Sequence, residues 1–139
     1  MFPKERLKKE AYEKIRDFVK QVKPLNPRLI ILYGSYARGD YTESSDIDVC
    51  VVAERLPEDI FRRRSLSGLH KVKNLNPIGY HPNEFLEELK GPNLFLYDVL
   101  REGVVIYDDG FLEEARGTLE EEIKRKGIVK SGDKWMFNV

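Results

Sequence analysis

Residues 29–52 read LIILYGSYARGDYTESSDIDVCVV, a polar link framed by two apolar runs. Each run has the length and the β-branched content of a buried strand, so the pattern predicts two neighbouring β-strands. The first run ends at Tyr33 and is followed at once by Gly34-Ser35, whereas the second starts with Asp46-Ile47-Asp48. Polar groups therefore gather where the first strand ends and the second begins.

The second apolar run opens with two acidic residues, Asp46 and Asp48. Residues two apart in a strand share a face and lie roughly 7 Å apart along the chain, so both carboxylates are expected to point the same way. Neighbouring carboxylates repel each other and raise their own pKa values unless a cation joins them. Mg²⁺ or Mn²⁺ suits such oxygen ligands, so the pair is a candidate metal site.

A glycine and a serine follow the first apolar run. Gly34 permits a tight exit from the strand, and Ser35-Tyr36-Ala37-Arg38 has the composition to begin a short helix. The N-terminus of a helix carries free N–H groups and a partial positive charge, which favour a phosphate. The stretch thus predicts a phosphate cradle that faces a pair of metal ligands.

These parts and their spacing resemble the signature of the nucleotidyltransferases of the DNA polymerase β superfamily. The resemblance rests on Gly34-Ser35, a ten-residue gap and Asp46-x-Asp48, with Ala37-Arg38-Gly39 after the serine and Ser45 before the first aspartate. The small size resembles the minimal nucleotidyltransferases of that superfamily. Residues 97–108 also look like the helix-then-strand segment that follows the catalytic core in those minimal members.

The resemblance implies a fold and an activity. The fold is α/β (α+β), with a mixed sheet of about four strands packed by helices, in a single domain over residues 1–139. The activity is Mg²⁺-dependent transfer of a nucleoside monophosphate from an NTP, with ATP favoured, to an acceptor hydroxyl on a protein, RNA or small molecule. The expected catalytic residues and ligands of Mg²⁺ (or Mn²⁺) are Asp46 and Asp48, and the expected nucleotide-binding residues are Gly34, Ser35, Arg38 and Ser45.

The sequence departs from this family at one position. The resemblance implies a third carboxylate on a later strand, one that receives the proton of the attacking hydroxyl. Spacing to the helix after Pro82 puts that position near Asn76, whose amide can ligate Mg²⁺ but cannot take up a proton. Glu84 and Asp98 are possible substitutes, and both lie in predicted helices.

Two other functions therefore stay open. The first is a catalytically impaired, nucleotide-binding regulatory protein, because minimal nucleotidyltransferases resemble antitoxins that act on HEPN-type RNase toxins. The second is an interaction module with a coincidental Asp-x-Asp, which would bind neither nucleotide nor metal. The small domain leaves one side of the expected site open, so a HEPN-type partner or a homodimer is predicted.

Periodicity and turn residues predict the remaining elements. A Pro at position 77 and a Gly at position 79 favour an edge position for the third strand. The tail is interpreted as a strand pair or a docked extension. The expected helices cover 3–23, 58–73, a segment after Pro82, 94 to near 103, and 111–126. The apolar positions of the helix over 58–73 are Ile60, Phe61, Leu66 and Leu69. The expected strands cover 74–80 and 104–107, and a tail runs to 139.

The chain carries 24 basic and 24 acidic side chains, so no global field favours nucleic acid or an anionic membrane, and nucleic-acid binding stays open. The most asymmetric stretch is 62–73, with five basic residues and no acidic one. It is either a solvated face or a receiver of phosphates from a nucleotide or an RNA.

The single cysteine, Cys50, lies in an apolar strand and is interpreted as a small buried hydrophobe. It has no cysteine to pair with, no stretch is apolar enough to span a bilayer, and no secretion signal is recognised, so a cytoplasmic protein is expected. His70 and His81 have no neighbours at zinc spacing.

Overall fold

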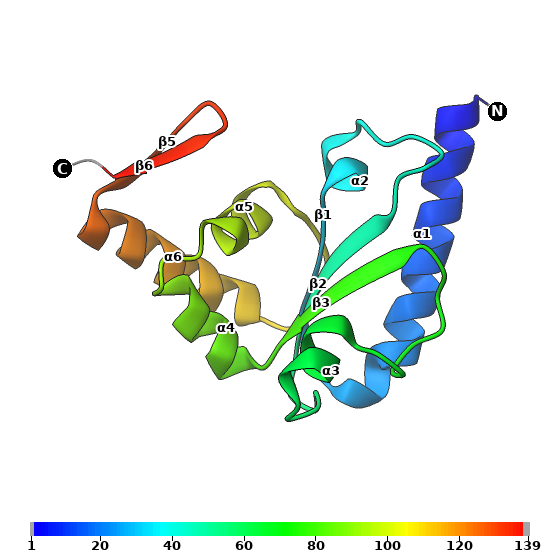
Figure 1. The fold of residues 1–139 in the computed structure, drawn as a ribbon, viewed down its shortest axis with the longest axis horizontal. Coiled ribbons are helices and arrows are strands. Elements are labelled where there is room, and N and C mark those ends of the chain that lie inside the picture. Colours follow the sequence, from blue (N-terminus) through cyan, green and yellow to red (C-terminus); the bar gives the residue numbers. More distant parts are fainter. Residues whose placement is uncertain (1, 138–139) are drawn as a thin grey trace.

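A computed structural model describes residues 2–137 and shows a four-stranded mixed sheet with helices on both faces (Figure 1). The strand order is β3-β2-β1-β4; β2 and β3 are parallel, and the other pairs are antiparallel. This confirms the predicted fold class. The strands are β1 (Pro27–Tyr33), β2 (Ile47–Ala53), β3 (Leu75–Tyr80) and β4 (Val104–Asp108), and a separate hairpin consists of β5 (Ile128–Ser131) and β6 (Lys134–Phe137).

The helices agree closely with the predicted ones except after β2. The N-terminal helix ends at Val22 and continues as one 3-10 turn, Lys23–Leu25, before the β1 strand. The predicted edge position of β3 is correct, and the tail forms a strand pair. The α-helices are α1 (Pro3–Val22), α2 (Ser35–Arg38), α3 (Ile60–Ser65), α4 (Pro82–Leu89), α5 (Leu94–Glu102) and α6 (Phe111–Lys126).

Both faces of the central strands are buried, which explains why these strands read as continuous apolar runs. Successive side chains of a strand point to opposite faces, so β1 supplies Ile30 and Leu32 to one side and Leu29 and Ile31 to the other. The first side packs on α1, and the second packs on α4, α5 and α6 (Figure 1). Cys50 is buried on the second side, as expected.

The prediction of a helix over 58–73 is wrong, because α3 covers only Ile60–Ser65. The chain turns into the left-handed region at Leu66 (φ 52°), whose side chain is fully buried, and again at Gly68 (φ 78°). The Ser65 hydroxyl donates to the Phe61 carbonyl, a local bond that competes with helix continuation. Ile60 and Phe61, two of the apolar positions of the predicted helix, are 49% and 82% exposed.

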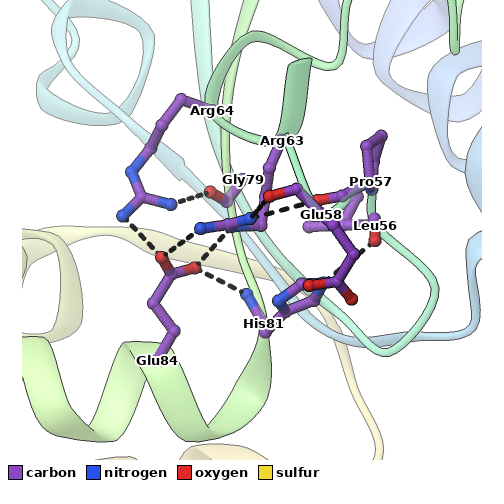
Figure 2. Close-up of polar contacts among 8 residues, drawn as sticks. All are labelled: Leu56, Pro57, Glu58, Arg63, Arg64, Gly79, His81 and Glu84. Atoms are coloured by element: carbon purple, nitrogen blue, oxygen red, sulfur yellow. Dashed lines mark hydrogen bonds and ion pairs between the residues drawn. The ribbon is translucent and has the colours of Figure 1, made fainter. Parts of the chain in front are cut away.

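Two of the five basic side chains in the stretch 62–73 are bound within the domain rather than solvated. Figure 2 shows that Arg63 and Arg64 both bind the Glu84 carboxylate, at 2.8–2.9 Å. Arg63 also donates to the carbonyls of Pro57 and Glu58, and Arg64 donates to that of Gly79. Arg63 and Arg64, two of the five basic side chains, therefore connect α3 to β3 and α4 through hydrogen bonds.

Glu84 belongs to the start of α4. Its carboxylate accepts a bond from the backbone N–H of His81, which closes a capping box at the first turn of the helix. Burial by itself would raise the pKa of Glu84, but the hydrogen bonds from Arg64 and Arg63 outweigh burial and lower the pKa to about 2. The carboxylate is thus ionised and fully engaged with its arginine partners.

We predict that Glu84→Gln destabilises the fold by about 2–4 kcal/mol, since it leaves two arginines without their counter-ion in a partly buried place. The folded-state pKa lies below the ordinary carboxyl value of 4.5. The contribution of Glu84 to stability is therefore complete above about pH 4.5 and is lost as the pH falls towards 2. Urea unfolding at pH 7 and at pH 3 measures both effects.

Glu87→Gln is the matched control, because Glu87 lies on the same helix and its side chain makes, among the described residues, only an exposed ion pair with Lys90. We expect this variant to change the free energy of unfolding by less than about 0.5 kcal/mol. Equal effects of the two substitutions would show that the arginine cluster does not stabilise the fold.

Candidate functional site

A pocket of about 560 Å³ lies where β1 ends and β2 begins, opposite helix α5. Its volume falls within the range of small-molecule sites, roughly 300–1,000 Å³. The sheet side of the pocket holds five of the six residues predicted for the site. These are Gly34, Ser35, Arg38, Asp46 and Asp48, and Asn76 lies with them.

The turn after β1 requires a glycine. Gly34 has φ 76° and ψ −153°, a backbone conformation that is essentially confined to glycine. A Cβ at this position would also collide with the Asp48 carboxylate. The absence of a side chain at Gly34 therefore lets the chain pass directly over Asp48 and start the single turn of α2 with Ser35.

Asp48 lies in β2 opposite Tyr33 of β1 and beside Asn76 of β3. Burial raises its pKa, and the nearby charge of Asp46 raises it further, whereas Asn76 and Arg38 act in the opposite direction. Asp46 comes just before β2 and is exposed. The two carboxylates are thus close enough to repel each other, and a cation between them would relieve that repulsion.

The donor set of this pair fits a hard divalent ion. Asn76 Nδ2 donates to Asp46 Oδ2 at 3.2 Å, so the amide lies beside the carboxylate pair, where a third carboxylate was expected. Within residues 2–137, no three His, Cys, Asp or Glu side chains converge. A cation held here would therefore take only two protein carboxylates and complete its shell with water or phosphate oxygens, as Mg²⁺ often does.

Two of the predicted nucleotide-binding residues make other contacts. The Arg38 guanidinium lines the pocket but pairs with Asp40 at 3.3 Å, on the exposed surface. Ser45 does not line this pocket; its hydroxyl accepts a bond from the Thr42 amide and shapes the loop before β2. Ser45 instead borders a smaller cavity beside α1.

Sequence reasoning did not assign the α5 wall of the pocket. Four residues on one face of this helix, together with the glycine that follows it, form the wall: Phe95, Asp98, Val99, Glu102 and Gly103. Their spacing of three and four is the signal that would have grouped them. Asp98, one of the two suggested substitutes for the third carboxylate, therefore lies in the pocket.

The α5 wall packs against β1 at both of its ends. The Phe95 ring packs edge-on against Tyr33, with centroids 5.3 Å apart. At the other end, a Cβ on Gly103 would collide with the Ile31 side chain and the Val99 carbonyl, so the glycine permits a close approach to β1. The other suggested substitute, Glu84, does not line the pocket and is bound by arginines (Figure 2).

We predict opposite effects of the same substitution at two glycines. Gly34→Ala should destabilise the fold by about 1–3 kcal/mol, since alanine cannot adopt this backbone conformation without strain and its Cβ meets Asp48. Gly117→Ala, in the exposed interior of α6 with open space around it, should stabilise the fold by about 0.5–1 kcal/mol. Urea unfolding measures both; a neutral Gly34→Ala would contradict the observed turn.

A second prediction concerns a cation at the carboxylate pair. Without metal, Asp48→Asn should melt at a higher temperature than the unmodified chain, because it removes a partly buried charge that repels Asp46. Mg²⁺ at ten times its dissociation constant should stabilise the unmodified chain by about 1.4 kcal/mol and leave Asp48→Asn unchanged. Thermal melts with Mg²⁺ or EDTA test this, and Asp17→Asn on α1 is the exposed control. Equal Mg²⁺ responses of all three proteins would exclude this site.

A family model described as the nucleotidyltransferase domain matches residues 12–130. Two relatives from Methanocaldococcus jannaschii are each named "Putative protein adenylyltransferase". One is 34% identical over 104 residues, which cover 69% of this chain and 69% of the relative. The other is 45% identical over 51 residues, which cover 34% of this chain and 52% of the relative, so the second match spans only about half of that protein.

Two solved structures are distant likenesses. One is described as the crystal structure of a "putative nucleotidyltransferase" from Sulfolobus solfataricus. It is 24% identical, with a TM-score of 0.46, and the match covers 71% of this chain and 87% of the other. The other is titled as a toxin-antitoxin with AMP-PNP; it is 20% identical, with a TM-score of 0.49, over 79% of this chain and 84% of the other.

No helix within residues 2–137 is long and apolar enough to cross a membrane.

Proposed function

Because the chain belongs to the nucleotidyltransferase domain family, we propose that it transfers a nucleoside monophosphate from a nucleoside triphosphate to an acceptor hydroxyl, with release of pyrophosphate. One observation carries the proposal. The Gly34 turn lies directly against the Asp48 carboxylate, so backbone N–H groups and a carboxylate pair border the same pocket. A nucleotide and its divalent cation need these two kinds of group side by side.

Asp46 and Asp48 would hold Mg²⁺ or Mn²⁺. When bound, such a cation supplies positive charge that neutralises phosphate oxygens during the transfer. Gly34 and Ser35 would bind the β- and γ-phosphates through backbone N–H groups and the Ser hydroxyl. Arg38 is exposed and could exchange its carboxylate partner for a phosphate, because its pair with Asp40 is a weak surface contact.

We further propose ATP as the donor and a protein hydroxyl as the acceptor. The names of the two Methanocaldococcus jannaschii relatives support this choice, since both contain the words "protein adenylyltransferase". An RNA or small-molecule hydroxyl is the alternative acceptor. The HEPN-type partner and the homodimer stay predictions.

One observation favours a second function, a nucleotide-binding regulatory protein without turnover. The side chain opposite Asp48 on β3 is the amide of Asn76, which cannot take up a proton. In that case the chain would bind the Mg²⁺–ATP complex and act through a partner protein.

The assay uses the purified chain, Mg²⁺, a cell extract as the source of acceptors, and ATP labelled at the α-phosphate or at the γ-phosphate. Transfer of AMP puts label on protein from the first ATP only. We expect Asp46→Ala and Asp48→Ala to lower the rate on the order of 10³-fold or more, because each removes charge stabilisation at the reacting phosphate. Mass spectrometry of the labelled proteins identifies the modified side chain.

Asp17→Ala, an exposed change on α1, is the control and should retain full activity. Binding of Mg²⁺–ATP measured by calorimetry, together with no labelled acceptor, would favour the regulatory protein. No binding of Mg²⁺–ATP would contradict both functions.

A further inference from the structure

Transfer to a hydroxyl requires a group that receives the hydroxyl proton. Asp46 and Asp48 are unsuited to this task in the proposed function, because their charge is needed for the cation. The neighbouring amide of Asn76 cannot accept a proton. The proton acceptor must come from another part of the pocket.

Only two other carboxylates line the pocket within residues 2–137, Asp98 and Glu102, and both belong to α5. They differ in how firmly they are held. Asp98 Oδ1 accepts two hydrogen bonds, from Lys130 Nζ at 2.5 Å and from Trp135 Nε1 at 2.9 Å. Glu102 accepts only from Lys130, and its side chain is 56% exposed, against 40% for Asp98. Asp98 is therefore the better positioned of the two.

The hydrogen bonds to Asp98 leave one oxygen available. Both protein donors bind Oδ1, and within residues 2–137 no donor binds Oδ2. Because α5 is fastened to β1 through Phe95 and Gly103, the position of Asp98 relative to the Gly34 turn is fixed by packing.

We propose that Asp98 is the catalytic base of the transfer, and that Lys130 and Trp135 of the C-terminal hairpin are its positioning residues. This inference rests on the proposed function. In the step, the acceptor oxygen forms a bond to the α-phosphorus, and the bond from that phosphorus to the bridging oxygen of pyrophosphate breaks. Pyrophosphate leaves with the electron pair, and the proton of the acceptor hydroxyl moves to Asp98 Oδ2.

Packing contacts of the β5–β6 hairpin hold the two donors in place beside the Asp98 carboxylate. Figure 1 shows β5 and β6, in red, after α6 and on the same side of the sheet as α5. The Trp135 ring packs edge-on against Tyr97 at 5.5 Å, and the Arg101 guanidinium lies over the same ring at 5.6 Å. Lys130 is only 17% exposed, and its hydrogen bonds to Asp98 and Glu102 raise the pKa of its ammonium group, which stays charged.

The test compares amide substitutions at three carboxylates with the α-labelled ATP assay. Asp98→Asn keeps the shape of the side chain but cannot accept a proton, so kcat should fall by about 10²- to 10⁴-fold. The dissociation constant of Mg²⁺–ATP, measured by calorimetry, should change less than about threefold. Glu121→Gln, on the exposed surface of α6, should leave kcat unchanged.

Glu102→Gln discriminates between the two carboxylates of α5. A kcat for Asp98→Asn within threefold of the unmodified chain, or a larger loss for Glu102→Gln, would overturn the proposal. If the unmodified chain transfers no label to any acceptor, the proposed function fails and this inference fails with it. If transfer occurs and Asp98→Asn is fully active, only the present inference fails.

Trp135→Phe tests the positioning role, because it preserves the aromatic packing and removes the N–H donor to Asp98. We expect a lower kcat with an unchanged KM for ATP and an unchanged melting temperature. Lys130→Met should act in the same direction. A loss of melting temperature together with a raised KM in both variants would indicate a merely structural hairpin and overturn the positioning role.

Discussion

The register between β1 and β2 is the constraint on which the pocket depends. Tyr33 lies opposite Asp48, and this pairing brings the next residue, Gly34, against the carboxylate. A slip of one residue would turn every side chain of β2 to the other face. Both faces of these strands are apolar, so hydrophobic burial alone discriminates poorly between the two registers. The polar end of the β1–β2 strand pair, where only glycine fits over the Asp48 carboxylate, therefore helps to fix the register.

The second wall of the pocket depends on the first. Helix α5 reaches β1 through an aromatic contact at Phe95 and a close backbone approach at Gly103, and the three pocket-lining side chains between these ends lie on the same helical face as Phe95. The hairpin after α6 then contacts the outer side of that wall through Lys130 and Trp135. The candidate site is thus assembled from segments that lie up to a hundred residues apart in sequence.

The convergence of residues on the sheet side of the pocket could be expected from the sequence, because that side is local. Gly34-Ser35 and Asp46-x-Asp48 lie at the ends of two adjacent strands, and short-range spacing is enough to bring them together. The α5 wall is different, since its helical face had to be matched to a partner strand far away in the chain. No short motif encodes such a packing partner.

The errors have equally physical causes. The helix predicted over 58–73 ended early because Leu66 turns into the core with a left-handed backbone, a tertiary effect that overrides local propensity. The basic stretch looked free because its counter-ion, Glu84, lies 20 residues later. Ser45 is a different case: the family resemblance put it among the expected nucleotide-binding residues, its hydroxyl accepts a hydrogen bond from Thr42 in the preceding turn, and its role in binding stays a prediction.

The arginine cluster of α3 also has a consequence for how this sheet meets other molecules. β3 is an edge strand, and an open strand edge invites pairing with a strand of another chain. Arg64 occupies the Gly79 carbonyl, and Pro77 in the same strand has no N–H to offer. Two backbone groups of this edge, close to the carboxylate pair, are therefore not available to a strand of another chain, which disfavours strand addition beside the pocket.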